Sequence, residues 1–216
     1  KSINSDFVLI SSFFEKKIGK YWWFINSSRL DLAPMGLPTS NNSFYNIFRK
    51  ILLYLNFTFY LFVKLFSKYK NVKFQGKYIF IFEDIKLKFN LKNKEDYYFS
   101  GLSKKINIKF INIVIGYKIF NDGKNFSIFE ISNKKDIFYL FLKSVIIYTK
   151  FNFLKNKVIK KTSNQKFWKN YQNKNNFINF FLSNLTYCYF KRFNFGKNKL
   201  IYPYEEKPYE RAVNHN

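Results

Sequence analysis

The chain has 216 residues, of which 47% are hydrophobic and 23% aromatic, so it holds enough apolar material for a packed core and lacks the composition of a disordered protein. It carries 38 Lys and Arg against 13 Asp and Glu, a formal net charge of +25. Such a charge opposes compaction by self-repulsion. It gives binding energy when a polyanion such as nucleic acid binds the protein, or when the protein meets an anionic membrane surface.

Catalytic residues are scarce. The single Cys188 excludes an internal disulfide and a Cys-based zinc site, and the single His215 leaves no base for most nucleophilic schemes. Adjacent acids such as Glu83 and Asp84 point to opposite faces of a strand. The sequence contains no phosphate-binding GxxxxGK[ST], no HExxH and no GxSxG. We therefore expect no enzymatic activity, no catalytic or metal site and no cofactor.

The first predicted region, residues 1–70, is rich in aromatic residues. Its amino-terminal part approximates a helical stripe that includes Phe7 and Phe14, and two prolines predict a loop over residues 26–43. Residues 44–66 are the most hydrophobic segment, but the uncharged part between Lys50 and Lys64 is shorter than the about 20 residues of a membrane span. A buried or interfacial helix is therefore favoured over a short span.

The second predicted region, residues 71–160, is an α+β core. Apolar and polar residues alternate within residues 72–131, which is a strand pattern. The turn signal of residues 121–124, Asn-Asp-Gly-Lys, predicts a hairpin whose return strand is "NFSIFEI". Residues 134–160 return to a helical pattern.

The third predicted region, residues 161–216, is a basic extension rich in Asn and Lys, followed by a tail that we expect to be extended. The fold class expected for the whole chain is α+β. It consists of a small, mostly antiparallel sheet packed with helices, together with extended basic segments and the extended tail.

Two long stretches lack any acid, from Ile137 to Tyr204 and from Leu32 to Phe82, and can present basic surfaces. Aromatic residues among the lysines would either stack on unpaired bases or belong to the core; they are Phe167, Trp168, Tyr171, Tyr187, Tyr189 and Phe190. The candidate RNA-binding residues are Arg29, Arg49, Lys143, Lys150, Lys155, Lys157, Lys160, Lys161, Lys166, Lys169, Lys191, Arg192, Lys197, Lys199 and Arg211.

The basic residues are almost all Lys, and Lys, Asn, Ile, Phe and Tyr have A+T-rich codons. This bias indicates an organelle genome, especially a mitochondrial one. Arg29 and Arg211 lie in two stretches whose amino-acid composition differs from the rest of the chain, and these stretches contain all four prolines. We expect both arginines to make specific contacts that Lys would not replace.

Two short pieces carry a family resemblance. The stretch "INSSRLDL" (Ile25–Leu32), followed by "SFYN", and the stretch "NIKFINIVIGYKIFNDGK" (Asn107–Lys124) resemble the KH-domain ribosomal protein three of the small subunit. The resemblance implies a strand and a "VIGxxG" turn that approaches the RNA backbone. Ile119 stands where that family has its second loop glycine, and a turn replaces the helix expected after it.

These observations together predict a structural component of the mitochondrial ribosome, in its small subunit and in the matrix. Its partners would be ribosomal RNA and neighbouring ribosomal proteins. One alternative is an accessory subunit of an inner-membrane respiratory complex anchored by residues 44–66, and membrane contact belongs to this alternative. A further alternative is a soluble RNA-processing factor.

Overall fold

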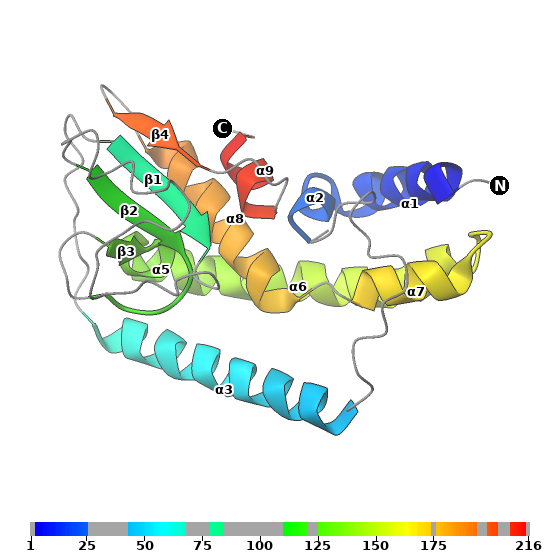
Figure 1. The fold of residues 1–216 in the computed structure, drawn as a ribbon, viewed down its shortest axis with the longest axis horizontal. Coiled ribbons are helices and arrows are strands. Elements are labelled where there is room, and N and C mark those ends of the chain that lie inside the picture. The colour runs from blue at the N-terminus through cyan, green and yellow to red at the C-terminus, as the bar shows by residue number, and fades with distance from the viewer. Residues whose placement is uncertain are drawn as a thin grey trace.

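The fold is mainly helical with one small sheet (Figure 1). The computed structural model describes residues 3–25, 43–67, 78–83, 110–120, 125–173, 176–193, 198–202 and 208–214. The helices are α1 (Ile3–Ile18), α2 (Tyr21–Ile25), α3 (Ser43–Phe66), α5 (Ile128–Ile131), α6 (Lys134–Ile159), α7 (Gln165–Asn173), α8 (Phe177–Arg192) and α9 (Pro208–Asn214). The strands are β1 (Tyr78–Glu83), β2 (Phe110–Ile115), β3 (Asn125–Ser127) and β4 (Lys199–Ile201).

The described strands form a sheet of order β3-β2-β1-β4 in which every pairing is parallel, so the prediction of a mostly antiparallel sheet was wrong. Residues 121–124, the predicted hairpin turn, lie outside the described residues, but β2 and β3 on either side of them pair in parallel. The side chains of Asn112 and Asn125, which face each other in this pair, are joined by a 2.6 Å hydrogen bond. Residues Ile111–Ile115 are buried at every position, as expected for a parallel strand covered on both faces.

The predicted return strand "NFSIFEI" is strand only in its first part. Ser127 ends β3 and caps α5 in a capping box: its hydroxyl accepts a hydrogen bond from the Glu130 amide at 3.0 Å, and the Glu130 carboxylate accepts one from the Ser127 amide at 3.1 Å. The Ser-x-x-Glu spacing is a helix-start signal that competes with the strand pattern. Local capping therefore changes the chain from strand to helix at this point.

Helix α6 confirms the helix predicted over residues 134–160, and α3 confirms the hydrophobic helix predicted over residues 44–66. The Asn133 side chain begins α6 by accepting a hydrogen bond from the Lys135 amide at 3.0 Å.

The expectation of extended basic segments and an extended tail was wrong. Residues 161–216 contain α7, α8, β4 and α9, and α8 is one of the most buried elements. Pro208 occupies the first position of α9, where a helix tolerates proline because that amide needs no partner. Ala212 is fully buried, where α9 packs on α2 and α8. The small side chain there permits the close approach that a packed core requires.

Two hydrophobic clusters form the core, and α8 contributes to both. The sheet cluster joins β1 and β2 to α3, α5 and α8, with Phe57, Ile113 and Phe181 among its buried members. The amino-terminal cluster joins α1, α2, α6 and α7, with Trp22 and Trp168 fully buried. The aromatic run of residues 21–24 is thus a short helix and a packing element.

Candidate nucleic-acid interface

A corner between α6 and α7 gathers basic side chains. Helix α6 ends at Ile159, whose carbonyl accepts a 2.6 Å hydrogen bond from the Thr162 hydroxyl. Helix α7 begins after Asn164, whose side chain accepts a hydrogen bond from the Phe167 amide at 3.1 Å. We call the lysines of residues 150–159 in α6, of the turn and of α7 the corner lysines: Lys150, Lys155, Lys157, Lys160, Lys161, Lys166 and Lys169.

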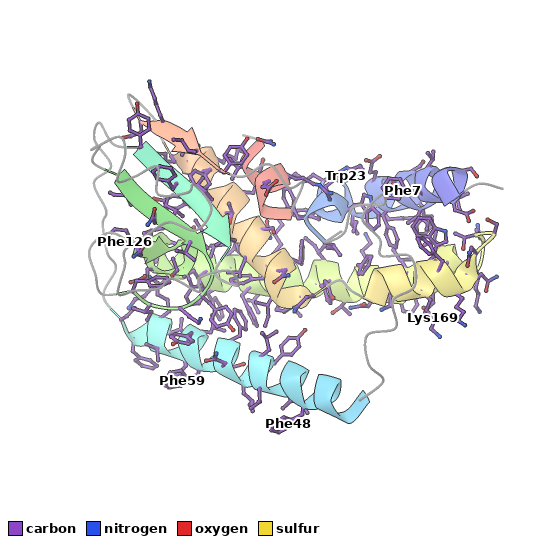
Figure 2. All side chains as sticks on the ribbon, in the orientation of Figure 1. Phe7, Trp23, Phe48, Phe59, Phe126 and Lys169 are labelled. Atoms are coloured by element: carbon purple, nitrogen blue, oxygen red, sulfur yellow. The ribbon has the colours of Figure 1, made fainter. Side chains whose placement is uncertain are left out.

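The corner lysines are exposed, except Lys155, which is half-buried. Figure 2 shows Lys169 on the side of α7 that faces away from α1. All seven were candidate RNA-binding residues from the sequence, and the structure places them on residues 150–159 of α6, on the turn after it and on α7. Lysines in such an arrangement bind phosphate as point charges.

The acid that approaches this corner is turned inward. Asp6 on α1 is 3% exposed, and its carboxylate accepts hydrogen bonds from the Ser163 amide at 3.0 Å, the Ser163 hydroxyl at 2.5 Å and the Trp168 indole at 3.2 Å. The Ser163 hydroxyl in particular lowers the pKa of Asp6, so the carboxylate stays charged. The charge of the Asp6 carboxylate is directed to Ser163 and Trp168, so it attaches the turn between α6 and α7 to α1. It does not neutralise the exposed lysines.

A second basic group lies where α2, α6 and α8 meet. The Lys143 ammonium lies 5.5 Å from the centre of the Tyr21 ring, and a hydrogen bond with Tyr21 raises the Lys143 pKa. The Lys20 ammonium lies 3.5 Å above the Tyr187 ring. Lys20 was not a candidate, because an isolated lysine at the end of α1 gives no sequence signal of its proximity to α8. Lys191 is exposed at the carboxyl end of the same α8.

Arg192 already has a partner within the protein. Its guanidinium is 2.6 Å from the Asp136 carboxylate, and this hydrogen bond raises the Arg192 pKa. The neighbouring Cys188 is half-buried, and burial raises the pKa of its thiol, which makes it a weak nucleophile.

Arg211 makes its described contacts within its own chain. Its guanidinium donates to the Trp23 carbonyl at 3.3 Å and lies 5.7 Å from the centre of a Trp23 ring. The contact is with the protein's own α2, so it joins α9 to the amino-terminal helices.

The remaining candidates lie apart from these groups in the sequence or outside the described residues. Lys199 is exposed on β4, with its ammonium 5.6 Å from the Tyr78 ring. Arg49 belongs to α3, but its side chain is outside the described residues, and Arg29 and Lys197 lie entirely outside them.

The aromatic candidates for base stacking are mostly core residues. Trp168 and Phe190 are buried, which removes their faces from any nucleic acid. Phe167, Tyr187 and Tyr189 are half-buried and pack against the two clusters, whereas the side chain of Tyr171 is outside the described residues. The interface defined by the described residues is therefore electrostatic, built from lysines.

The turn that resembles a KH glycine loop is held against the protein. Gly116 follows β2, and the buried Tyr117 packs edge-on against Phe57 at 5.3 Å. The Phe120 amide donates to the Glu130 carboxylate at 2.9 Å. Residues 117–120 are not helical.

The fold and this surface define the chain as a basic, mainly helical protein with a small parallel sheet and a lysine-rich corner. No known protein family, no curated protein and no solved structure matches it.

Proposed function

We propose that the protein is a structural component of the mitochondrial ribosome, in its small subunit, where it binds ribosomal RNA in the matrix and contacts neighbouring ribosomal proteins. The observation that carries the RNA-binding proposal is the set of corner lysines, which have no acid beside them in the sequence and whose nearby Asp6 carboxylate is buried. The codon bias of the composition and the short resemblance to the KH-domain family support the ribosomal assignment.

Binding would be electrostatic and independent of base sequence. Each phosphate neutralised by a lysine releases condensed counterions, so the logarithm of the binding constant falls by about 0.7–0.9 per phosphate for each unit of the logarithm of salt concentration. The hydrogen bonds that the Asp6 carboxylate accepts from Ser163 and Trp168 fix the turn between α6 and α7, which holds the lysines in place before RNA binds.

A salt titration of RNA binding tests the proposal. The affinity of the protein for a fragment of small-subunit ribosomal RNA would be measured from low to moderate salt. We expect steep weakening, and a smaller slope for the triple variant Lys160→Gln, Lys161→Gln, Lys166→Gln. The control removes the same charge from exposed lysines elsewhere, in Lys16→Gln, Lys17→Gln, Lys118→Gln. Salt-independent binding, or equal slopes for both variants, would contradict the proposal.

Sedimentation tests the ribosomal assignment separately. In a gradient of lysed mitochondria, a ribosomal component would co-migrate in stoichiometric amount with the small subunit, and treatment with ribonuclease would move it to the top. An RNA-processing factor would bind RNA in the titration but would be sub-stoichiometric in the gradient.

Two observations favour the respiratory-complex alternative: the exposed apolar face of α3, and the length and apolar composition of α6, which among the described helices is the one long and apolar enough to cross a membrane. As an anchor that crosses the bilayer, however, α3 is short, because its apolar part runs only from Ile51 to Phe66. Crossing would also expose to lipid Lys64, which is 2% exposed and donates to the Glu130 carbonyl at 2.5 Å. Carbonate extraction separates the two functions, because a spanning subunit stays in the membrane pellet and a ribosomal protein washes out.

A further inference from the structure

The outer side of α3 exposes a regular row of large apolar side chains. We call these six residues the α3 row: Phe48, Leu52, Leu55, Phe59, Phe62 and Phe66. Each is at least half exposed, and their spacings of four and three residues place them on one face of the helix. Figure 2 shows Phe48 and Phe59 pointing away from the rest of the protein. The row is about 27 Å long at the helical rise per residue.

Two polar side chains of α3, Lys64 and Thr58, are satisfied within the protein, whereas Asn56 is exposed beside the row. Lys64 faces the opposite side, where its ammonium is buried on the Glu130 carbonyl. The Thr58 hydroxyl donates to the Tyr54 carbonyl of its own helix at 2.8 Å, which satisfies it locally. Ile51 and Leu65 extend the apolar surface beside the row and are themselves exposed. The exposed apolar surface of α3 is therefore wider than the row alone. An interface between two proteins typically has a polar rim around its apolar centre, so a wide apolar surface fits lipid better than protein.

The inner side of α3 fixes how this face is presented. Phe57 packs on Phe129 and Phe181, and the Lys134 ammonium donates to the Leu65 carbonyl at 2.9 Å. Because both the middle and the carboxyl end of α3 are tied to the body, the helix presents its row lengthwise. A flat apolar partner meets the whole row at once in this orientation.

The charges around the row favour an anionic partner. Arg49 and Lys50 precede the apolar part, Lys134 and the exposed Lys135 lie at its other end, and the sequence has no acid from Leu32 to Phe82. With a net charge of +25, a second copy of the chain would be repelled at this face. Anionic lipid headgroups supply the opposite charge at the ends, and acyl chains accept the apolar arc.

We propose that the α3 row docks the protein on the surface of an anionic bilayer, with α3 lying in the plane of the interface. This goes beyond RNA binding and does not depend on it, because the corner lysines lie on α6 and α7. The protein could then hold RNA and membrane at once, by separate surfaces.

Vesicle flotation tests the docking. Nuclease-treated protein would be mixed with vesicles of equal parts phosphatidylcholine and phosphatidylglycerol, or of phosphatidylcholine alone. We expect binding to the anionic vesicles that partly survives moderate salt. The pair Leu55→Gln and Phe59→Gln should weaken this binding at least about tenfold, because each removes a large apolar side chain from the interface.

The control pair Leu142→Gln and Ile146→Gln removes apolar side chains of similar exposure (47% and 69%, against 62% for both Leu55 and Phe59) from α6. It should bind within about twofold of the unaltered protein, and the triple variant of the corner lysines should keep its vesicle binding while it loses RNA affinity. Circular dichroism would check that each variant keeps its helix content.

Three results would overturn the docking. The first is failure of the unaltered protein to bind anionic vesicles, and the second is equal loss in the α3 and α6 pairs. The third is a change confined to protein assembly, in which the α3 pair abolishes a dimer or incorporation into ribosomal particles but leaves vesicle binding intact; the row would then be covered by protein.

Discussion

At the residue scale, Asp6 connects the first helix to the lysine-rich corner. Its carboxylate takes hydrogen bonds from two groups of Ser163 and from the Trp168 indole, all more than 150 residues away in sequence. These three bonds meet on Oδ2, and the Ser163 amide is also 3.1 Å from Oδ1, so both carboxylate oxygens act as acceptors. An amide side chain would carry no charge and would place an NH₂ donor at one of these two positions. Asp6 is therefore the residue through which the folding of α1 positions the corner lysines.

We predict that Asp6→Asn lowers the melting temperature by several degrees at neutral pH. Because folding lowers the pKa of Asp6 from its ordinary value of 3.8, its contribution to stability is fully present above that value and is lost as the pH falls through the lower pKa of the folded state. Thermal melts across the acid range should show the gap between the variant and the unaltered protein closing at low pH. Glu15→Gln, which alters an exposed carboxylate, is the control, and a gap that stays constant with pH would contradict this assignment.

At the element scale, the attachment of α3 depends on its inner face. Phe57 is 3% exposed and contacts the rings of Tyr117 and Phe181 at 5.3 and 5.7 Å. We predict that Phe57→Ala costs about 3–5 kcal/mol of unfolding free energy, as for other buried Phe truncations. Phe59→Ala, two residues away on the outer face, should change stability by no more than about 0.5 kcal/mol.

Denaturant unfolding measures both free energies, and hydrogen exchange locates the effect. Amides of α3 should exchange faster in Phe57→Ala than in Phe59→Ala, while those of α8 change less. If Phe57→Ala and Phe59→Ala lowered the unfolding free energy equally, the inner face of α3 would not be the buried face and the outer face would not be the exposed one.

The sequence predicts those helices and strands that are determined by their own local pattern, and it does not predict those that are determined by tertiary packing. Helices α3 and α6 are long and strongly apolar, so local pattern suffices for them. Helix α8 was missed because Phe180 and Phe181 enter different clusters, and a helix buried all round shows no amphipathic stripe. Strand direction was missed because pairing depends on the path of the connections, which alternation within a strand does not encode.

The sequence identified the lysines of the candidate interface but not the residues that pack beside them. Long acid-free stretches identified the corner lysines, since charge is a property of composition. Neither the buried Asp6 beside them nor Lys20 beside Lys143 could be predicted, because each lies more than 100 residues from its neighbours in the chain. Contacts at such separations come from packing of α1 and α2 on α6 and α8.

At the scale of the whole molecule, the net charge of +25 destabilises the folded state by self-repulsion, and a bound polyanion relieves that repulsion. The corner lysines have no acid among the residues from Ile137 to Tyr204 to offset them. Folding confines these like charges to one helix–turn–helix segment, residues 150–169. The free protein should therefore be destabilised by the same repulsion that favours binding of RNA.

We predict opposite responses to salt for folding and for RNA binding. Chloride salt should raise the melting temperature of the RNA-free protein, most steeply below about 0.1 M, where the Debye length is still longer than about 10 Å. The same increase should weaken RNA binding, because counterion release then gains less free energy. Thermal melts of the unaltered protein and of Lys160→Gln, Lys161→Gln, Lys166→Gln measure the first effect, and the variant should show a smaller rise because less repulsion remains to be screened. A melting temperature that stays constant or falls with salt would mean that the lysines are too far apart to repel one another. Lysines so widely spaced would also release fewer counterions when RNA binds.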